Sequence, residues 1–184
     1  MSMITVKSAI PKDLIDSWSS TTERIPSRPG ETFDKSLPSG ISNDKNMRSC
    51  ETRFITFNNH RKFYLNILDN IYPFIDFYQH AFNVQLYRVL ELQHTTYFKD
   101  DHYAKHLDTI FDNKIPHQRK ISLVLMLSDR SEYSGGELII NNEPVDLDKG
   151  DMVMFKPTTH HAVEKVQQGV RKTLVMWALG PHWR

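Results

Sequence analysis

Hydrophobic positions in the first half of the chain follow a helical period. Between residues 60 and 83, apolar side chains recur at spacings of three, four and seven, as at Phe63, Ile67, Ile71, Phe74 and Phe82. This spacing predicts an amphipathic helix packed on a core. Pro73 is expected to kink or divide that helix, because proline removes a helical hydrogen bond. A shorter helix is predicted over residues 9–19, with Pro11 near its first turn.

After residue 86 the pattern changes to short apolar stretches separated by turn residues. Eight strands are predicted, at residues 87–97, 102–109, 120–128, 136–140, 143–147, 151–156, 161–166 and 171–179. Many short strands with turns between them indicate a sandwich or barrel, and eight is the number in a jelly roll. The predicted fold is mostly β, with flanking helices. A single domain of residues 1–184 would contain a helical and loop region over 1–85 and a jelly-roll core over 86–180.

Residues 20–49 show neither the helical nor the strand pattern. Serine, threonine, proline, glycine, asparagine and aspartate dominate the segment, and apolar residues are sparse. This composition predicts a long loop. Long loops in compact domains are often lids or binding segments, although a plain surface excursion explains the composition equally well.

Composition narrows the functional classes. The formal net charge of +1 lacks the basic excess typical of nucleic-acid binding, and no apolar run reaches the length of a membrane span. The first residues show no apolar signal core. Cys50 is the only cysteine, which excludes an internal disulfide and a cysteine-based zinc site. We therefore expect a cytoplasmic protein without nucleic-acid or membrane partners, and the sequence assigns no oligomeric state.

Candidate metal ligands stand two apart in a predicted strand. Alternate residues of a strand share a face, so His106 and Asp108 would present an imidazole and a carboxylate side by side. A third ligand could come from His160 or His161, at the start of another predicted strand. Two histidines and one carboxylate form the facial triad of non-haem Fe(II) oxygenases. The histidine–aspartate pair alone is weak, because the chain has nine histidines.

An arginine strengthens this interpretation. Arg171 stands ten residues after His161 and begins an apolar strand. A buried guanidinium is costly unless it meets an anion, and its planar fork suits a carboxylate.

The order and spacing of these motifs resemble a known family. Tyr97-x5-Tyr103-x2-His106-x-Asp108, then YSGGEL, KGDMVMFKP and finally His161-x9-Arg171-x5-Trp177 are similar to the 2-oxoglutarate- and Fe(II)-dependent dioxygenases of the prolyl 4-hydroxylase type. Small bacterial and viral members are the most similar. The resemblance covers residues 87–180, and residues 46–54 (NMRSCETRF) match the segment before the barrel only faintly. It implies a double-stranded β-helix.

The resemblance also implies a role for each motif residue. His106, Asp108 and His161 would ligate iron, and the spacing to Arg171 favours His161 over His160. Arg171 would bind the distal carboxylate of 2-oxoglutarate, and Tyr97 and Tyr103 would line the co-substrate pocket. Trp177 and Gln93 are expected in the substrate pocket, while Gly135 and Gly136 would form a turn. No catalytic side chain is expected beyond the metal centre.

The implied activity is hydroxylation with Fe(II), 2-oxoglutarate and O₂, supported by ascorbate and yielding succinate and CO₂. The favoured substrate is a prolyl residue in a protein or peptide, which residues 20–49 and 111–120 could cover. The alternatives are a free amino acid or small metabolite as substrate, or a non-catalytic cupin-like metal-binding module. DNA-repair dealkylases usually carry a second arginine six residues after the first, where this chain has Trp177.

Overall fold

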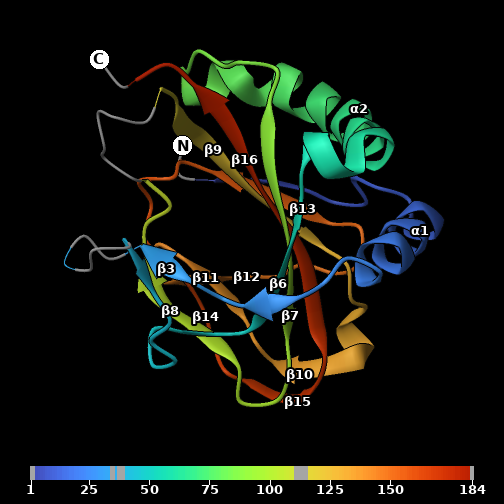
Figure 1. Ribbon diagram of the computed structural model, residues 1–184, viewed down its shortest axis with the longest axis vertical. Helices are drawn as coiled ribbons and strands as arrows, with labels where there is room; N and C mark the ends of the chain where they lie inside the picture. The colour runs from blue at the N-terminus through green and yellow to red at the C-terminus, as the bar shows by residue number, and fades with distance from the viewer. Residues whose placement is uncertain (1–2, 34–35, 37–39, 110–115, 183–184) are drawn as a thin grey trace.

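The computed structural model describes residues 3–33, 36, 40–109 and 116–182, which form two larger β-sheets and two α-helices (Figure 1). Two pairs of short strands complete this described part of the chain. Residues 110–115, at the start of the predicted 111–120 cover, lie outside it, as do residues 34–35 and 37–39 of the predicted 20–49 loop.

The strands after residue 86 form a jelly roll. Its eight strands are β7 (Leu90–Tyr97), β8 (His102–His106), β9 (Gln118–Met126), β11 (Leu138–Ile140), β12 (Glu143–Val145), β13 (Met152–Phe155), β14 (His161–Val163) and β16 (Arg171–Gly180). One sheet contains the order β13-β9-β16-β7, and the other contains β12-β11-β14-β8. The first, third, sixth and eighth strands thus share one sheet, and the remaining four share the other. This interleaving is that of a double-stranded β-helix, so the predicted fold class is confirmed.

All eight strands have limits that differ from the predicted ones, and two of the differences change the topology or the site. The strand expected over residues 102–109 ends at His106. The stretch 161–166 is divided between β14 and β15 (Val166–Gly169), and β15 pairs with β10 (Tyr133–Gly135) rather than with a strand of the larger sheets. A short 3₁₀ helix, η1 (Arg130–Glu132), precedes β10.

The N-terminal half adds strands that the sequence did not predict. β1 (Met3–Val6), β2 (Arg28–Pro29) and β6 (Glu51–Ile55) extend one sheet to seven strands, and β5 (Arg48–Ser49) extends the other to five. β3 (Thr32–Phe33) and β4 (Ile41–Ser42) pair with each other. The described part of residues 20–49 is therefore not a plain loop, because β5 pairs with β8 of the jelly roll, β2 pairs with β6, and β3 and β4 pair with each other.

Both predicted helices are present, with different limits. α1 (Lys12–Glu23) begins after Pro11, and α2 (Phe57–Phe82) begins at Thr56, whose hydroxyl accepts a hydrogen bond from the Asn59 amide. α2 continues through Pro73, and non-helical backbone angles occur at His60 instead. The helix is therefore not divided at Pro73, and the alternative expectation of a kink there stays a prediction. Among the described residues, no helix has the length and apolar composition needed to cross a membrane.

The seven-stranded sheet has two different sides. Alternate residues of β16, such as Leu174 and Met176, pack with α1 and α2 in one apolar cluster. The residues that alternate with them along the strand are Thr173, Val175 and Trp177, and these line a cavity on the opposite side of the sheet. We call these the helix-facing side and the cavity-facing side. The period-2 alternation of one strand thus separates a closed core from an open pocket.

Candidate functional site

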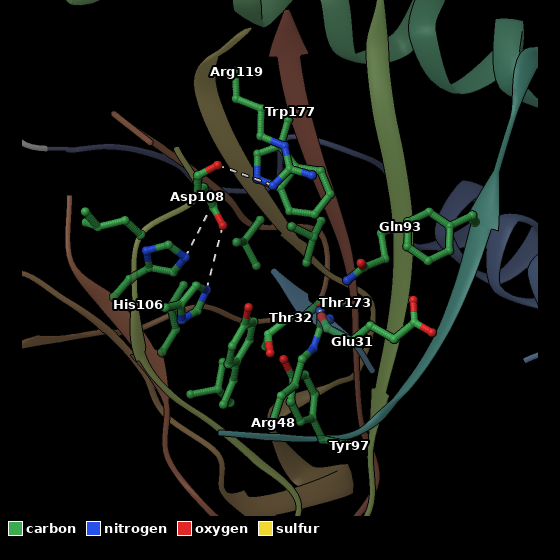
Figure 2. Close-up of a pocket in the computed structure, with 18 of the residues that line it drawn as sticks. Glu31, Thr32, Arg48, Gln93, Tyr97, His106, Asp108, Arg119, Thr173 and Trp177 are labelled. Atoms are coloured by element: carbon green, nitrogen blue, oxygen red, sulfur yellow. Dashed lines mark hydrogen bonds and ion pairs between the residues drawn. The ribbon is translucent and has the colours of Figure 1, made fainter. Parts of the chain in front are cut away.

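A cavity of about 240 Å³ lies between the two sheets (Figure 2). Its walls come from β7, β9 and β16 of the seven-stranded sheet, from β8 and β14 of the five-stranded sheet, and from β3 and β4. Eight side chains were expected at the site, and all of them line this cavity. They are Gln93, Tyr97, Tyr103, His106, Asp108, His161, Arg171 and Trp177.

Three potential metal ligands meet at one end of the cavity. The ligand atoms of His106, Asp108 and His161 all lie within 4.8 Å of one another. His106 Nε2 is 3.7 Å from Asp108 Oδ1, and His161 Nε2 is 3.4 Å from Asp108 Oδ2. Figure 2 shows the His106 ring facing the Asp108 carboxylate. The neighbouring His160 is exposed and does not join this cluster.

The contacts that place Asp108 in the cluster were not predicted from the sequence. Because β8 ends at His106, strand alternation does not place the carboxylate. The Asp108 amide instead donates to the Pro157 carbonyl at 3.0 Å. Arg119 Nη1 donates to the Asp108 carbonyl at 3.4 Å, and the Ser122 hydroxyl donates to Asp108 Oδ2 at 2.7 Å. Contacts from outside β8 therefore hold this residue.

Backbone carbonyls fix the orientation of both imidazoles. His106 Nδ1 lies 2.8 Å from the Ala104 carbonyl, and His161 Nδ1 lies 3.0 Å from the Thr159 carbonyl. A carbonyl oxygen only accepts, so each Nδ1 carries a proton. When either ring is neutral, its lone pair is on Nε2, the nitrogen on the side of Asp108, which is the arrangement a metal-binding histidine needs.

Burial and neighbouring charges shift the pKa values of all three residues of the cluster. Burial opposes ionisation of Asp108, but its contacts with His161 and His106 outweigh burial and hold the pKa of this carboxyl well below its usual range. Burial, followed by the charge of His161, lowers the pKa of His106 to about 3. Burial also lowers the pKa of His161, but the hydrogen bond and charge of Asp108 prevail and raise it. A metal ion at His161 would compete with a proton for the ring nitrogen.

Arg171 supplies a buried cation without an acidic partner. Its side chain is 2% exposed, and no carboxylate of the described residues lies within ion-pairing distance. Arg171 Nη2 contacts Met126 Sδ at 3.7 Å, while Nε has no hydrogen-bond partner in the described part of the chain. Burial lowers the pKa of Arg171, an effect that Tyr97 and Tyr133 partly offset. Such a guanidinium is suited to a carboxylate ligand, because burying it unpaired is costly.

The double glycine makes room for this arginine. Gly135 and Gly136 both have positive φ, of 70° and 66°. A Cβ on Gly136 would lie 2.9 Å from Arg171 Cδ and 2.8 Å from Val166 Cγ2. The turn therefore permits a close approach that any other residue would obstruct.

Two tyrosines connect the arginine to the metal cluster. Tyr97 is 3% exposed, and the Arg171 guanidinium carbon lies 5.4 Å from its ring centroid. Tyr103 stacks on the His106 ring, with centroids 3.5 Å apart and planes 13° apart. The Arg48 guanidinium carbon lies 4.5 Å from the Tyr103 centroid. Burial raises the pKa of both phenols, so each keeps its proton as a hydrogen-bond donor.

Trp177 and Gln93 line the cavity beyond this cluster. The Arg119 guanidinium carbon lies 3.6 Å from the centre of the Trp177 ring, and Trp177 Nε1 has no partner among the described residues. Gln93 Nε2 donates to Thr95 Oγ1 at 2.9 Å. This region combines an apolar ring, an unpaired indole N–H and side-chain amide groups.

Arg48, Arg119 and Ser122 are site residues that were not identified from the sequence. Arg48 comes from a two-residue strand, and no local pattern identifies it. Ser122 lies on β9 between the buried residues Ile121 and Leu123, and a serine at such a position was a usable signal. Arg119 stands near the start of the same strand, between a glutamine and a lysine, where no apolar alternation identifies it. Arg119 was instead placed in a connecting turn.

The donor set fits a divalent iron ion and a dicarboxylate. Two imidazole nitrogens and one carboxylate form a facial triad, which leaves positions open on the cavity side. Arg171, with its unpaired Nε, lines the same cavity and can receive a second anionic group.

Known proteins share these features. Residues 92–179 match the family model of the 2OG-Fe(II) oxygenase superfamily. A PKHD-type hydroxylase of Aliarcobacter butzleri is 35% identical over 89 residues, which cover 44% of this chain and 39% of that protein. The chain spans well under half the length of the curated relatives it matches.

Solved structures match over nearly the whole chain. The viral collagen prolyl hydroxylase of Paramecium Bursaria Chlorella virus-1 superimposes with a TM-score of 0.73 at 16% identity, covering 98% of this chain and 97% of that one. A prolyl-4-hydroxylase of Pseudomonas putida gives a TM-score of 0.68 at 19% identity, covering 96% and 91%. Residues 92–179 are therefore similar to the 2OG-Fe(II) oxygenase superfamily, and the chain shares the fold of solved prolyl hydroxylases.

Proposed function

We propose that this protein is a 2-oxoglutarate- and Fe(II)-dependent hydroxylase that acts on prolyl residues of a protein or peptide. One observation carries the proposal: a histidine–aspartate–histidine cluster and a buried arginine without an acidic partner line the same cavity. Neither feature has a role in packing that would explain it. The cluster suits an iron ion, and the arginine suits the distal carboxylate of 2-oxoglutarate.

His106, Asp108 and His161 would hold the iron. The carbonyls of Ala104 and Thr159 orient the two imidazoles, so no rotation of the rings is required when the ion binds. Asp108 supplies the negative charge. The pKa of its carboxyl lies well below the usual range, and the raised pKa of His161 means that a metal ion competes with a proton at this imidazole.

Arg171 would bind the distal carboxylate of 2-oxoglutarate. Its guanidinium is held by β16 and by the space that Gly136 leaves open. Tyr97 lies beside Arg171, Tyr103 stacks on His106, and both line the cavity, where they can donate hydrogen bonds to the co-substrate. The arginine thus orients the dicarboxylate with its other end toward the metal.

When bound, iron and 2-oxoglutarate supply the oxidising chemistry that inserts one oxygen atom of O₂ into a C–H bond and converts 2-oxoglutarate to succinate and CO₂. The chain provides orientation and exclusion of water. Val124, Val175 and the Trp177 ring form an apolar part of the cavity lining. An apolar wall protects the reacting centre from solvent.

A peptide substrate is supported by the N-terminal segment. Glu31, Thr32, Gly40 and Ile41 line the cavity, so the described part of residues 20–49 lies beside the proposed site. Such a position suits a cover over an extended peptide. The viral neighbour is a collagen prolyl hydroxylase by name, which favours a protein substrate. Protection of residues 20–49 from limited proteolysis by a proline-rich peptide is expected, and unchanged cleavage there would count against the cover.

The same contacts support a single functional domain over residues 1–184. Arg48 and Phe54 of the N-terminal half line the cavity together with residues of the jelly roll. Cys50 is a buried free thiol, which fits a reducing compartment such as the cytoplasm.

The proposal is tested by incubating the protein with Fe(II), 2-oxoglutarate, ascorbate and proline-containing peptides. Expected results are succinate formation and a +16 Da shift on a prolyl residue by mass spectrometry, both absent with Asp108→Ala. Incubation with a cell lysate extends the search to whole proteins. A +16 Da shift confined to a free amino acid would replace the prolyl assignment. Absence of succinate and of 2-oxoglutarate turnover in every mixture would favour a non-catalytic binding module.

A further inference from the structure

Ser122 is a buried hydroxyl that contacts the metal cluster from a different strand. It lies on β9, beside Phe155 and Trp177 on the neighbouring strands, and is 0% exposed. Its hydroxyl donates to Asp108 Oδ2 at 2.7 Å. A serine in the centre of a buried strand gains little from packing, so this hydrogen bond is the feature that distinguishes the position.

Asp108 needs such a contact because its strand has ended. The Pro157 carbonyl and Arg119 hold only the backbone N–H and C=O of Asp108. Rotation about the last side-chain bond of an aspartate is soft, with a broad distribution rather than sharp minima. The backbone contacts therefore leave the carboxylate plane free to turn, and the Ser122 hydroxyl restrains it.

The two oxygens of this carboxylate have different surroundings. Oδ1 lies 3.7 Å from His106 Nε2, whereas Oδ2 receives the Ser122 hydrogen bond and lies 3.4 Å from His161 Nε2. A carboxylate that gives both oxygens to a metal takes two coordination positions. A facial triad with a chelating co-substrate and O₂ requires that it take one. A hydrogen bond that occupies Oδ2 favours coordination through Oδ1 alone.

We propose that Ser122 is a positioning residue that commits Asp108 to bind the metal through a single oxygen, and so keeps open the coordination position that 2-oxoglutarate or O₂ needs. The inference rests on the proposed function, because it takes the cluster to be a metal site. Ser122 acts through Asp108 and does not touch substrate.

Metal affinity provides the first test. Metal-free protein is titrated with Mn(II), and the free ion is measured by electron paramagnetic resonance. Ser122→Ala should weaken Mn(II) binding by about 10–100-fold, the usual cost of removing a partner of a metal ligand. Ser122→Thr keeps the hydroxyl and should restore the affinity of the unmodified chain.

Ser128→Ala is a matched control. Ser128 is also buried, at 1% exposure, but its hydroxyl donates to the Val170 carbonyl and accepts from the Lys172 amide. Its loss removes two hydrogen bonds that do not involve the cluster. Stability should fall, and Mn(II) affinity should stay unchanged.

The second test is the charge-transfer absorption of Fe(II) with 2-oxoglutarate, recorded without oxygen at saturating metal. If the carboxylate of Ser122→Ala binds through both oxygens, chelation by 2-oxoglutarate is impaired and the absorption should be reduced. Ser122→Thr and Ser128→Ala should keep the full absorption. This readout responds to coordination and not to general loss of stability.

The outcomes separate this inference from the proposed function. An unmodified chain that binds neither Mn(II) nor Fe(II) overturns the proposed function and the inference together. An unmodified chain that binds both, with Ser122→Ala equal to it in both tests, overturns the positioning role alone. Ser122→Thr as weak as Ser122→Ala would assign the effect to packing and also overturn it. If Ser122→Ala does not fold, Ser122→Cys, with similar volume and a weak donor, replaces it under the same criteria.

Discussion

The two sides of the seven-stranded sheet are made by the same strands but differ in chemistry. On the helix-facing side, Ile121, Leu123 and Leu125 of β9 pack with buried aliphatic and aromatic residues of α1 and α2. On the cavity-facing side, alternate residues of the same sheet include Ser122 and Arg171. Two buried donors there, Arg171 Nε and Trp177 Nε1, have no partner among the described residues.

This difference assigns stability to one side and chemistry to the other. Apolar burial stabilises a fold wherever the surfaces pack closely, and the helix-facing cluster is closed. Unpaired buried donors cost free energy unless a ligand satisfies them, so the cavity-facing side is complete only with its ligands. Substitutions on the two sides should therefore have separable effects on stability and on activity.

Asp108→Ala should have the largest effect, on the cavity-facing side. The change removes the anionic ligand, so metal affinity should fall by more than the roughly 100-fold upper range for an outer-shell residue, and turnover should be abolished. Succinate formation and Mn(II) titration measure both. The circular dichroism spectrum should stay that of the unmodified chain, because the residue lies outside the apolar clusters. Retained turnover would refute the assignment of Asp108 as a ligand.

Ile71→Ala should have the opposite signature, on the helix-facing side. Ile71 is 0% exposed and belongs to the apolar cluster beneath α2. Removing its buried methyl and methylene groups should lower the free energy of unfolding by about 2–5 kcal/mol. Denaturant unfolding measures this loss, and Mn(II) affinity of the folded fraction should be unchanged. A large loss of affinity in this variant would mean that the two sides are not separable.

The sequence predicts the features of the two sheet sides that depend on local patterns, but not those that depend on contacts between distant segments. The eight strand regions and the alternation along β16 are local patterns, and they place Arg171 and Trp177 correctly on one side. Arg48 enters the cavity only because β5 pairs with β8, a contact between distant segments.

Two local expectations failed because tertiary contacts prevailed. Asp108 lies beyond the end of β8, and its contacts with β9 and Pro157 place it, not strand alternation. α2 continues through Pro73 because buried residues on both sides of the proline, Ile71 and Ile75, pack in one core. That packing outweighs the local cost of proline.

His94 is a buried polar residue on the helix-facing side. It is 0% exposed, and neither ring nitrogen has a partner in the described part of the chain. Burial, reinforced by Arg53 and Lys172 and only partly offset by Glu23, lowers its pKa from 6.5 to about 4. Between these values the unfolded chain binds a proton that the folded chain does not. Stability should therefore fall as pH drops from 6.5 to 4, by up to about 3 kcal/mol.

His94→Leu tests this pH dependence. The variant keeps the buried volume and removes the titrating group, so its unfolding free energy should fall less steeply between pH 6.5 and 4 than that of the unmodified chain. Denaturant unfolding at several pH values provides the comparison. Parallel pH profiles for the two proteins would show that His94 does not contribute.

Arg171→Lys returns to the cavity-facing side with a smaller change. The charge remains, but the two-pronged geometry for a carboxylate is lost. A hydrogen bond to a charged group contributes about 1.5–3 kcal/mol, so the dissociation constant for 2-oxoglutarate should rise about 10–100-fold. Calorimetry with 2-oxoglutarate and titration with Mn(II) separate the two ligands. Equal losses of both affinities would identify Arg171 as a structural residue.

The central claim is that the cavity-facing side binds a metal and a dicarboxylate together. Anomalous diffraction from crystals grown with Mn(II) and 2-oxoglutarate tests it most directly. We expect one manganese peak within bonding distance of His106, Asp108 and His161, with a carboxylate of 2-oxoglutarate on Arg171. A manganese peak elsewhere, or a carboxylate distant from Arg171, would contradict the account.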